Sequence, residues 1–307
     1  MVVCCMCAGC GFNVKTIPSG EIPGGPKACD HFMCLEGIRY HYTEHPADGP
    51  DIVLVHGFAS STYTWEAIVP YLCERGYHVF ALDLKGFGWS DKPADAAYDP
   101  VSLMQEVNTW MDARGLTQAV FVGNSLGGAI AALMALEHPA RISKLVLIDA
   151  AGYPMKSPMI IRLAHLPLAG SVMKLFFGPW VVRWNLKEVF SDDDRITEEK
   201  VTAYYDRLRT EKALEAQIAV ARSLKLDGLE QYIKRISDIA ANTLIIWGQD
   251  DRWIPLDIGR RFTNDIAGST LTVIPECGHM PQEEQPKRTA ELIIDFIDDN
   301  HHMNGGK

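Results

Sequence analysis

The stretch VFVGNSLGGAIA, residues 120–131, places one serine, Ser125, among apolar residues and glycines. A run rich in Val and Phe precedes the serine and small residues follow it, which predicts a strand, a sharp turn and a helix. Gly123, Gly127 and Gly128 would let the strand and the helix approach closely at that turn. The pattern therefore predicts a strained turn that presents the Ser125 hydroxyl at the edge of a sheet.

Short β-branched runs alternate with helical patterns from about residue 36 onward, which is typical of a parallel sheet with helices on both faces. FMCLEGIRYHY, residues 32–42, predicts a hairpin that opens the sheet. A helix is expected after Asp99, with Pro100 in its first position and Gly115 at its end. We expect an α/β fold with a mostly parallel central sheet, whose buried strands are 51–55, 78–83, 119–123, 144–149, 243–247 and 271–274.

The alternation breaks once, between Asp149 and Thr243, where no run has the pattern of a buried strand. This segment is first rich in Met, Pro and aromatic residues and then charged and helical, which predicts a helical insertion that we call the cap. The expected organisation is a Cys-rich tail or linker (1–35), the first part of the core (36–152), the cap (153–238), the second part of the core (239–300) and a C-terminal tail (301–307).

A serine hydroxyl is a weak nucleophile at neutral pH, so catalysis needs a base and a group that orients the base. His279 follows the predicted strand 271–274, and Asp250 and Asp251 follow the strand 243–247. Because parallel strands bring their carboxyl ends to one edge of the sheet, these side chains are expected to meet Ser125 there. The order Ser, Asp, His is the one that hydrolases with this strand, turn and helix use.

Two backbone N–H groups are expected to stabilise a developing oxyanion. The N–H of Leu126 lies at the predicted helix start, beside Ser125. The second donor is expected from LVHGFASS, residues 54–61, where the N–H of Phe58 would face the turn. His56 in the same loop is expected to shape it by hydrogen bonds.

The chain resembles the α/β-hydrolase superfamily, in the group with a helical cap, over roughly residues 36 to 300. The matching stretches occur in the expected order: HGFASSTYTW, LDLKGFGWSDKP, GNSLGG, LVLIDAAG, WGQDDRWIP and GHMPQEEQP. The resemblance implies Ser125 as nucleophile, His279 as base, Asp251 as acid, and the N–H groups of Phe58 and Leu126 as oxyanion donors. Haloalkane dehalogenases and epoxide hydrolases carry an aspartate at the nucleophile position, so the serine argues against both activities.

The resemblance also ranks the acidic residues. In the family the acid stands four residues before a proline, which selects Asp251 over Asp250. Asp149 is the rival acid, since some relatives draw the acid from the strand before the cap. Glu283 and Glu284 are expected to cap the final helix.

The substrate is expected to be apolar, because the cap segment 153–186 is mostly apolar. Candidate substrate contacts are Asn124, Trp180 and Trp184. The first hypothesis is hydrolysis of apolar acyl or aromatic esters through an acyl-enzyme. The alternative is C–C bond hydrolysis of the meta-cleavage type, which the chain resembles through Asn124 and the CGH at 277–279, although Met280 stands where those enzymes have a tryptophan. A non-catalytic ligand-binding relative is a third hypothesis.

Charge and cysteine content bound the partners. A net charge of −10 with no Lys/Arg cluster argues against nucleic acid, and we expect no cofactor and no metal; the oligomeric state stays open. The tail holds four of the eight cysteines (Cys4, Cys5, Cys7 and Cys10), which resemble a lipoprotein cleavage site or an acylation cluster. A cytoplasmic location is favoured, with a lipid-anchored form that contacts a membrane through this tail as the alternative.

Overall fold

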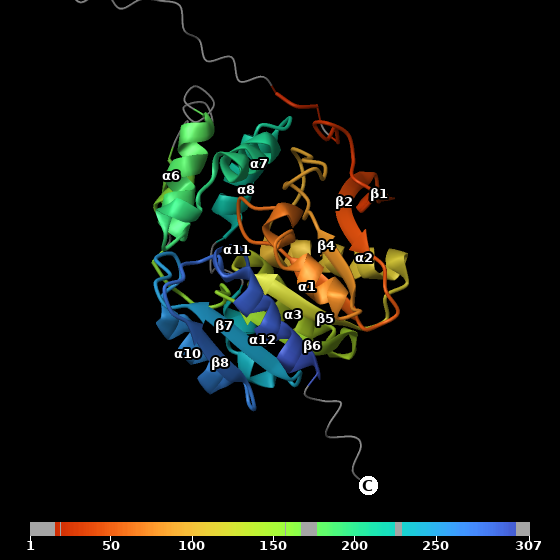
Figure 1. Ribbon diagram of the computed structural model, residues 1–307, viewed down its shortest axis with the longest axis vertical. Helices are drawn as coiled ribbons and strands as arrows, with labels where there is room; N and C mark the ends of the chain where they lie inside the picture. Colours follow the sequence, from red (N-terminus) through yellow and green to blue (C-terminus); the bar gives the residue numbers. More distant parts are fainter. Residues whose placement is uncertain (1–15, 19, 157, 167–176, 225–228, 299–307) are drawn as a thin grey trace, which may run out of the picture.

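Eight strands form one sheet in the order β1-β2-β4-β3-β5-β6-β7-β8 (Figure 1). The strand β2 is antiparallel to both of its neighbours, and the other neighbouring strands are parallel. The computed structural model describes residues 16–18, 20–156, 158–166, 177–224 and 229–298. The strands are β1 Asp30–Leu35, β2 Ile38–His45, β3 Asp51–Val55, β4 His78–Leu82, β5 Ala119–Asn124, β6 Ile142–Ile148, β7 Thr243–Gly248 and β8 Thr270–Ile274. The predicted fold class is confirmed.

Helices cover both faces of this sheet because its strands are apolar on both sides. In β3, Val53 and Val55 pack into the core beneath α2, α3 and α10, whereas Ile52 and Leu54 pack beneath α1 and α12. The helices of the core are α1 Val69–Glu74, α2 Pro100–Arg114, α3 Leu126–Glu137, α10 Leu256–Asp265, α11 Pro281–Glu284 and α12 Pro286–Asp298, with 3-10 helices η1 Thr62–Trp65 and η2 Pro139–Arg141.

The helix α2 begins and ends as its sequence predicts. The Asp99 side chain accepts hydrogen bonds from the N–H groups of Val101 and Ser102. Pro100 has no backbone N–H group, so it leaves no donor unpaired in the first turn. Gly115 ends the helix in the left-handed region, at φ 71°.

The sheet begins before the boundary that the sequence predicted. Its first strand starts at Asp30, so residues 30–35 belong to the sheet and not to a tail. The His41 ring of β2 is buried between two carboxylates, with Nδ1 2.7 Å from Asp83 and Nε2 3.1 Å from Asp30. Asp83 follows β4 and also accepts from two backbone N–H groups, which ties the first hairpin to the core.

The cap lies between β6 and β7. Figure 1 shows α6, α7 and α8 together at the upper end of the molecule, beyond the sheet. The Gln217 side chain of α8 donates to the carbonyl of Gly86, so the cap also contacts the core directly. Its helices are α4 Met159–Ala164, α6 Pro179–Val189, α7 Glu198–Leu208, α8 Ala213–Ser223 and α9 Glu230–Ile233, with 3-10 helices η3 Asp193–Arg195 and η4 Ile236–Asp238.

The part of the N-terminal segment that the structure describes reaches the cap. Ile17 is buried, and its backbone exchanges hydrogen bonds with Arg209 and Glu211 at the end of α7. The cysteines at 4, 5, 7 and 10 lie outside the described residues. The four described cysteines are free; Cys277 is buried, whereas Cys34 is exposed. No described helix is both long and apolar enough to cross a bilayer.

Candidate active site

Ser125 occupies the sharp turn between β5 and α3. Its backbone has φ 54° and ψ −116°, a conformation that residues other than glycine rarely adopt. The turn is held by backbone hydrogen bonds of 3.0 Å, from the Ser125 N–H to the Ile148 carbonyl and from the Ala151 N–H to the Ser125 carbonyl. The neighbouring strand β6 and the residues after it therefore fix the strained conformation.

Three glycines make the close approach around Ser125 feasible. A Cβ atom on Gly123 would overlap the backbone of Gly127, and one on Gly127 would overlap the carbonyl of Val55. A Cβ on Gly128 would overlap the side chain of Ala150. The helix α3 therefore packs against strands β3 and β5 at a distance that only glycine permits at these positions.

His279 and Asp251 meet beside this turn. Nδ1 of His279 lies 2.7 Å from an Asp251 oxygen, and both side chains are almost fully buried. The other Asp251 oxygen accepts from the N–H groups of Trp253 and Ile254, which orients the carboxylate. Asp250, in contrast, is exposed.

His279 shares a small cavity with Ser125, of about 20 Å³. Its Nε2 atom is buried and has no hydrogen-bond partner among the described residues. Asn124 lines the same cavity, and its side-chain amide donates to the carbonyls of Ile148 and His279 at 3.2 Å. Asn124 therefore ties the loop that carries His279 to the sheet.

Phe58, one of the predicted oxyanion donors, lines this cavity, and Leu126, the other, lines a neighbouring cavity that also reaches Ser125. Neither the Phe58 N–H nor the Leu126 N–H donates a backbone hydrogen bond within the described part of the chain. A Cβ on Gly57 would lie 3.0 Å from the Cβ of Ser125, so the loop before Phe58 passes close to that serine. His56 is buried, which lowers its pKa; its Nδ1 donates to the Gly57 carbonyl and its Nε2 accepts from a backbone N–H. His56 thus holds the loop and has no free ring nitrogen.

Asp149, the rival acid, lies beside the pair but is not bonded to the histidine. One Asp149 oxygen accepts from the Gly248 N–H at 2.9 Å, and the other is buried with no partner among the described residues. Oxygens of Asp149 and Asp251 and a nitrogen of His279 lie within 4.8 Å of one another, a spacing that would also suit a metal ion. Burial and the neighbouring Asp251 raise the pKa of Asp149 well above its usual range. A proton is thereby favoured on Asp149.

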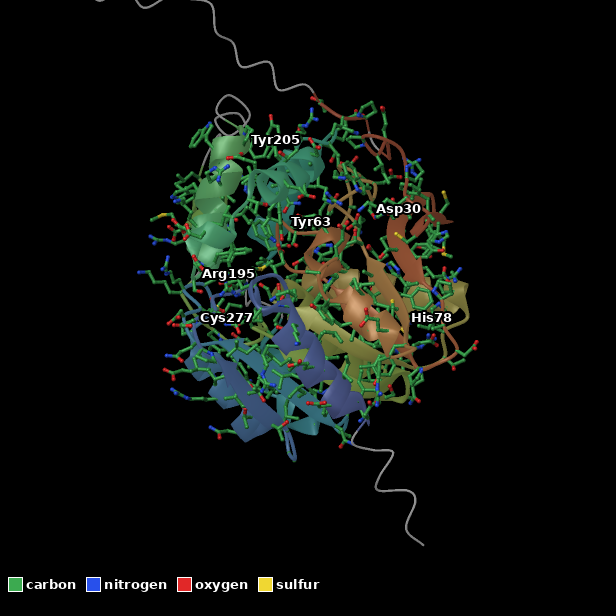
Figure 2. All side chains as sticks on the ribbon, viewed as in Figure 1. Asp30, Tyr63, His78, Arg195, Tyr205 and Cys277 are labelled. Atoms are coloured by element: carbon green, nitrogen blue, oxygen red, sulfur yellow. The ribbon has the colours of Figure 1, made fainter. Side chains whose placement is uncertain are left out.

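The structure corrects the expectation that Glu283 and Glu284 cap the final helix. Both are buried and lie in α11, before α12 begins. Glu284 accepts from the N–H groups of Gly278 and Ser191, so it joins the histidine loop to the cap. Figure 2 labels Arg195 at the same junction, where its guanidinium donates to the Glu284 carbonyl.

Glu283 holds a second contact between core and cap. Its carboxylate accepts from Tyr204 and Lys200 of α7 and from the Thr64 hydroxyl of the core, the last at 2.7 Å. The Lys200 ammonium also lies 5.7 Å from the centre of the Tyr63 ring, which Figure 2 labels. We call Lys200, Tyr204 and Glu283 the cap anchor. No local sequence pattern predicts it, because Glu283 is 79 residues from Tyr204 in the chain.

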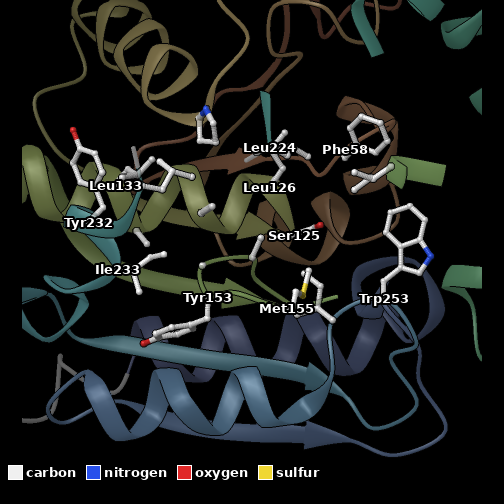
Figure 3. Close-up of a pocket in the computed structure, with 18 of the residues that line it drawn as sticks. Phe58, Ser125, Leu126, Leu133, Tyr153, Met155, Leu224, Tyr232, Ile233 and Trp253 are labelled. Atoms are coloured by element: carbon white, nitrogen blue, oxygen red, sulfur yellow. The ribbon is translucent and has the colours of Figure 1, made fainter. Parts of the chain in front are cut away.

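A larger cavity of about 490 Å³ also opens at Ser125 and extends along α3 (Figure 3). No described Asp, Glu, Lys or Arg side chain lines it. Trp180 and Trp184 line neither cavity and are 63% and 40% exposed on α6, which corrects the expectation that they contact the substrate. Trp253, which the sequence analysis did not single out, lines both cavities instead.

Comparison with known proteins places this geometry in a family. A family model described as alpha/beta hydrolase fold matches residues 50–286. The uncharacterized hydrolase YugF of Bacillus subtilis is 33% identical over 265 residues, which cover 86% of this chain and 96% of that protein. The 2-hydroxy-6-oxo-6-phenylhexa-2,4-dienoate hydrolase of Comamonas testosteroni is 30% identical over 272 residues, which cover 86% of this chain and 92% of that protein.

A solved structure is similar as well. The crystal structure of a membrane phospholipase A, described as a bacterial virulence factor, superposes with a TM-score of 0.73 at 28% identity. The match covers 88% of this chain and 86% of that one.

Proposed function

The chain belongs to the alpha/beta hydrolase family and is a hydrolase, and we propose that it cleaves carboxylic esters of apolar substrates through an acyl-enzyme on Ser125. The observation that carries the proposal is the 2.7 Å contact of His279 with Asp251, next to a buried Nε2 that shares a cavity with the serine. This is the arrangement that a serine nucleophile needs, with a base and a group that orients the base.

The first step forms the acyl-enzyme. Donation of the Nδ1 hydrogen to Asp251 fixes the His279 tautomer, so Nε2 carries the lone pair. Nε2 takes the Ser125 proton while Oγ attacks the ester carbonyl, and the negative charge that develops on the carbonyl oxygen accepts hydrogen bonds from the N–H groups of Phe58 and Leu126. Asp251 stabilises the imidazolium that results.

The second half returns the enzyme to its starting state. The protonated His279 gives its proton to the departing alkoxide, which leaves as an alcohol, and Ser125 keeps the acyl group. A water molecule then attacks the acyl carbonyl while Nε2 accepts one of its protons. Collapse of this intermediate releases the acid and restores the Ser125 hydroxyl.

C–C bond hydrolysis is the second candidate, favoured by the 30% identity to the dienoate hydrolase and by Asn124 before the nucleophile. A dienoate carries a carboxylate, which a binding site ordinarily neutralises with a cation. The described lining of the large cavity provides neither Lys nor Arg, and its only basic side chain is His165. The mostly apolar lining and the similarity to a phospholipase A support the ester.

The test combines covalent labelling with turnover. A fluorophosphonate probe is expected to label the wild type and not Ser125→Ala, and the labelled peptide should contain residue 125. Hydrolysis of a short ester and of a dienol ring-cleavage product is then measured with the same preparations. Labelling that persists in Ser125→Ala would refute the nucleophile, and turnover of the dienol product alone would establish the second candidate.

A further inference from the structure

Two unequal cavities meet at Ser125. The larger one, about 490 Å³, is lined by Ser125 and Leu126 but not by His279. The smaller one, about 20 Å³, is lined by both Ser125 and His279. A third cavity of about 60 Å³ lies next to the small one beneath the cap and shares Phe58 and Tyr204 with it. Of the two cavities that meet at Ser125, His279 therefore lines the smaller one and not the larger one.

This asymmetry has a chemical consequence for an ester. His279 must protonate the oxygen of the departing alcohol, so the alcohol has to leave on the side that His279 lines. The acyl group, which stays on Ser125, is left with the opposite side. Given the ester hydrolysis proposed above, we infer that the substrate is an ester of a long, linear acyl chain with a small alcohol, and that the acyl chain lies in the large cavity along α3.

We call the part of the large cavity that runs along α3 the acyl track. Ala129, Ala132, Leu133 and Leu136 line it from one side of α3, at the spacing of one helical face. Figure 3 shows Leu133 on α3 well beyond Ser125, with Tyr232 and Ile233 of α9 near it at the same end of the cavity. The described lining is mostly apolar, with His165, Tyr153 and Tyr232 as its polar exceptions away from Ser125, which suits a hydrocarbon chain.

The helix also gives the track a length scale. With a rise of about 1.5 Å per residue, Ala132 lies about 10 Å and Leu136 about 16 Å along α3 from Ser125. An extended chain advances about 1.2 Å per bond, which is the reach of the polypeptide backbone divided over its three bonds. An acyl chain would thus pass Ala132 after about eight carbons and reach Leu136 after about thirteen.

The first experiment needs only the wild type and two isomeric esters, ethyl octanoate and octyl acetate. They have the same composition and place the long chain on the acyl or on the alcohol side. Ethyl octanoate is expected to have the higher kcat/KM, by more than about 100-fold, since each buried methylene contributes about fourfold. Equal values, or a preference for octyl acetate, would overturn the inference.

The second experiment measures the track with substitutions and the ethyl esters of C4, C8 and C12 acids. The wild type should gain in kcat/KM along the whole series. Ala132→Phe should keep the gain from C4 to C8 and lose that from C8 to C12. The control Leu214→Phe narrows the third cavity, which Leu214 lines, and should leave the acyl preference unchanged.

The outcomes separate this inference from the proposed function. Wild-type protein that labels with the probe and hydrolyses the C4 ester, but shows no gain with acyl length, refutes the acyl track alone. Protein that hydrolyses no ester refutes both. Because the isomer comparison uses the wild type, it decides the inference even where Ala132→Phe does not fold.

Discussion

Asp149 and Asp251 place carboxyl oxygens within 4.8 Å of each other, and only Asp251 is hydrogen-bonded to His279. Two buried carboxylates at this separation repel each other strongly, so one of them holds a proton. The hydrogen-bond partners of each carboxyl group decide which of the two holds the proton. Asp251 has two backbone N–H donors and the imidazole, whereas Asp149 has one donor and an oxygen without a partner in the described structure.

Asp251→Asn should lose about 10⁴-fold in kcat, because the amide can neither hold the productive tautomer of His279 nor stabilise its charged form. Folding should change little, since the side-chain oxygen can still accept from Trp253 and Ile254. Steady-state kinetics and thermal unfolding check both parts. Asp250→Asn is the matched control and should stay close to the wild type. A loss in Asp250→Asn that equals the loss in Asp251→Asn would contradict the assignment.

Asp149→Asn should keep most of the activity, because its amide resembles the neutral acid. Its stability should depend on pH differently from the wild type. The folded pKa of Asp149 is raised by burial and by Asp251, so its stabilising contribution is complete below its unfolded pKa of about 3.9 and is lost as pH rises toward the folded pKa. The asparagine does not titrate. As pH rises from about 4, the free energy of unfolding of the variant should therefore increase relative to that of the wild type.

Urea unfolding of both proteins at several pH values measures that difference. A constant difference across the range would mean that Asp149 is ionised in the folded protein. Abolished turnover in Asp149→Asn, with turnover retained in Asp251→Asn, would make Asp149 the catalytic acid.

The effects on stability of substitutions at Lys200 and Glu283, two members of the cap anchor, should not be additive. Lys200→Met leaves the Glu283 carboxylate buried without its cation and should cost about 3–5 kcal/mol, and Glu283→Gln should cost a similar amount. The double variant should cost at least about 1 kcal/mol less than the sum, because no unpaired charge remains. Chemical denaturation of the four proteins gives the cycle. Lys187→Met removes an exposed pair with Asp193 as a control and should cost under about 1 kcal/mol.

His41→Gln should destabilise the protein most at low pH. Burial alone would lower the pKa of His41, but the carboxylates of Asp83 and Asp30 outweigh burial and raise it. The stability contributed by the charged ring is then fully present below the unfolded pKa of about 6.5 and is lost as pH rises through the folded pKa. The free energy of unfolding of the variant should be about 3 kcal/mol below that of the wild type at pH 5.5, and this difference should be smaller at pH 9. Denaturant unfolding checks this, with His138→Gln as the control; a gap that widens with pH would refute it.

The sequence was most informative where one local rule decides the structure. The buried strands β3 and β5 are continuous apolar runs, and Ser125 stands between a strand and a helix start, so the pattern alone locates both. The residues His279 and Asp251 follow strands, which brings them to one edge of the sheet. These inferences needed no knowledge of contacts between distant segments.

Contacts made through the cap could not be predicted in the same way. Tyr204 and Glu283 are 79 residues apart, and no local pattern links them. The helix α6 has apolar residues on two sides: Val182 and Leu186 face inward, and Trp180 and Trp184 face solvent. Because both sides look apolar in sequence, only packing decides which side meets the core.

The small cavity beside His279 also bears on which acceptor takes the acyl group. In the proposed ester hydrolysis, the departing alcohol vacates the cavity of about 20 Å³ beside His279, which is large enough for a water molecule. The water that enters this space stands next to Nε2 of His279, which can take its proton. On that proposal, a small cavity next to the base admits water more readily than a bulky alcohol and so favours hydrolysis over transacylation.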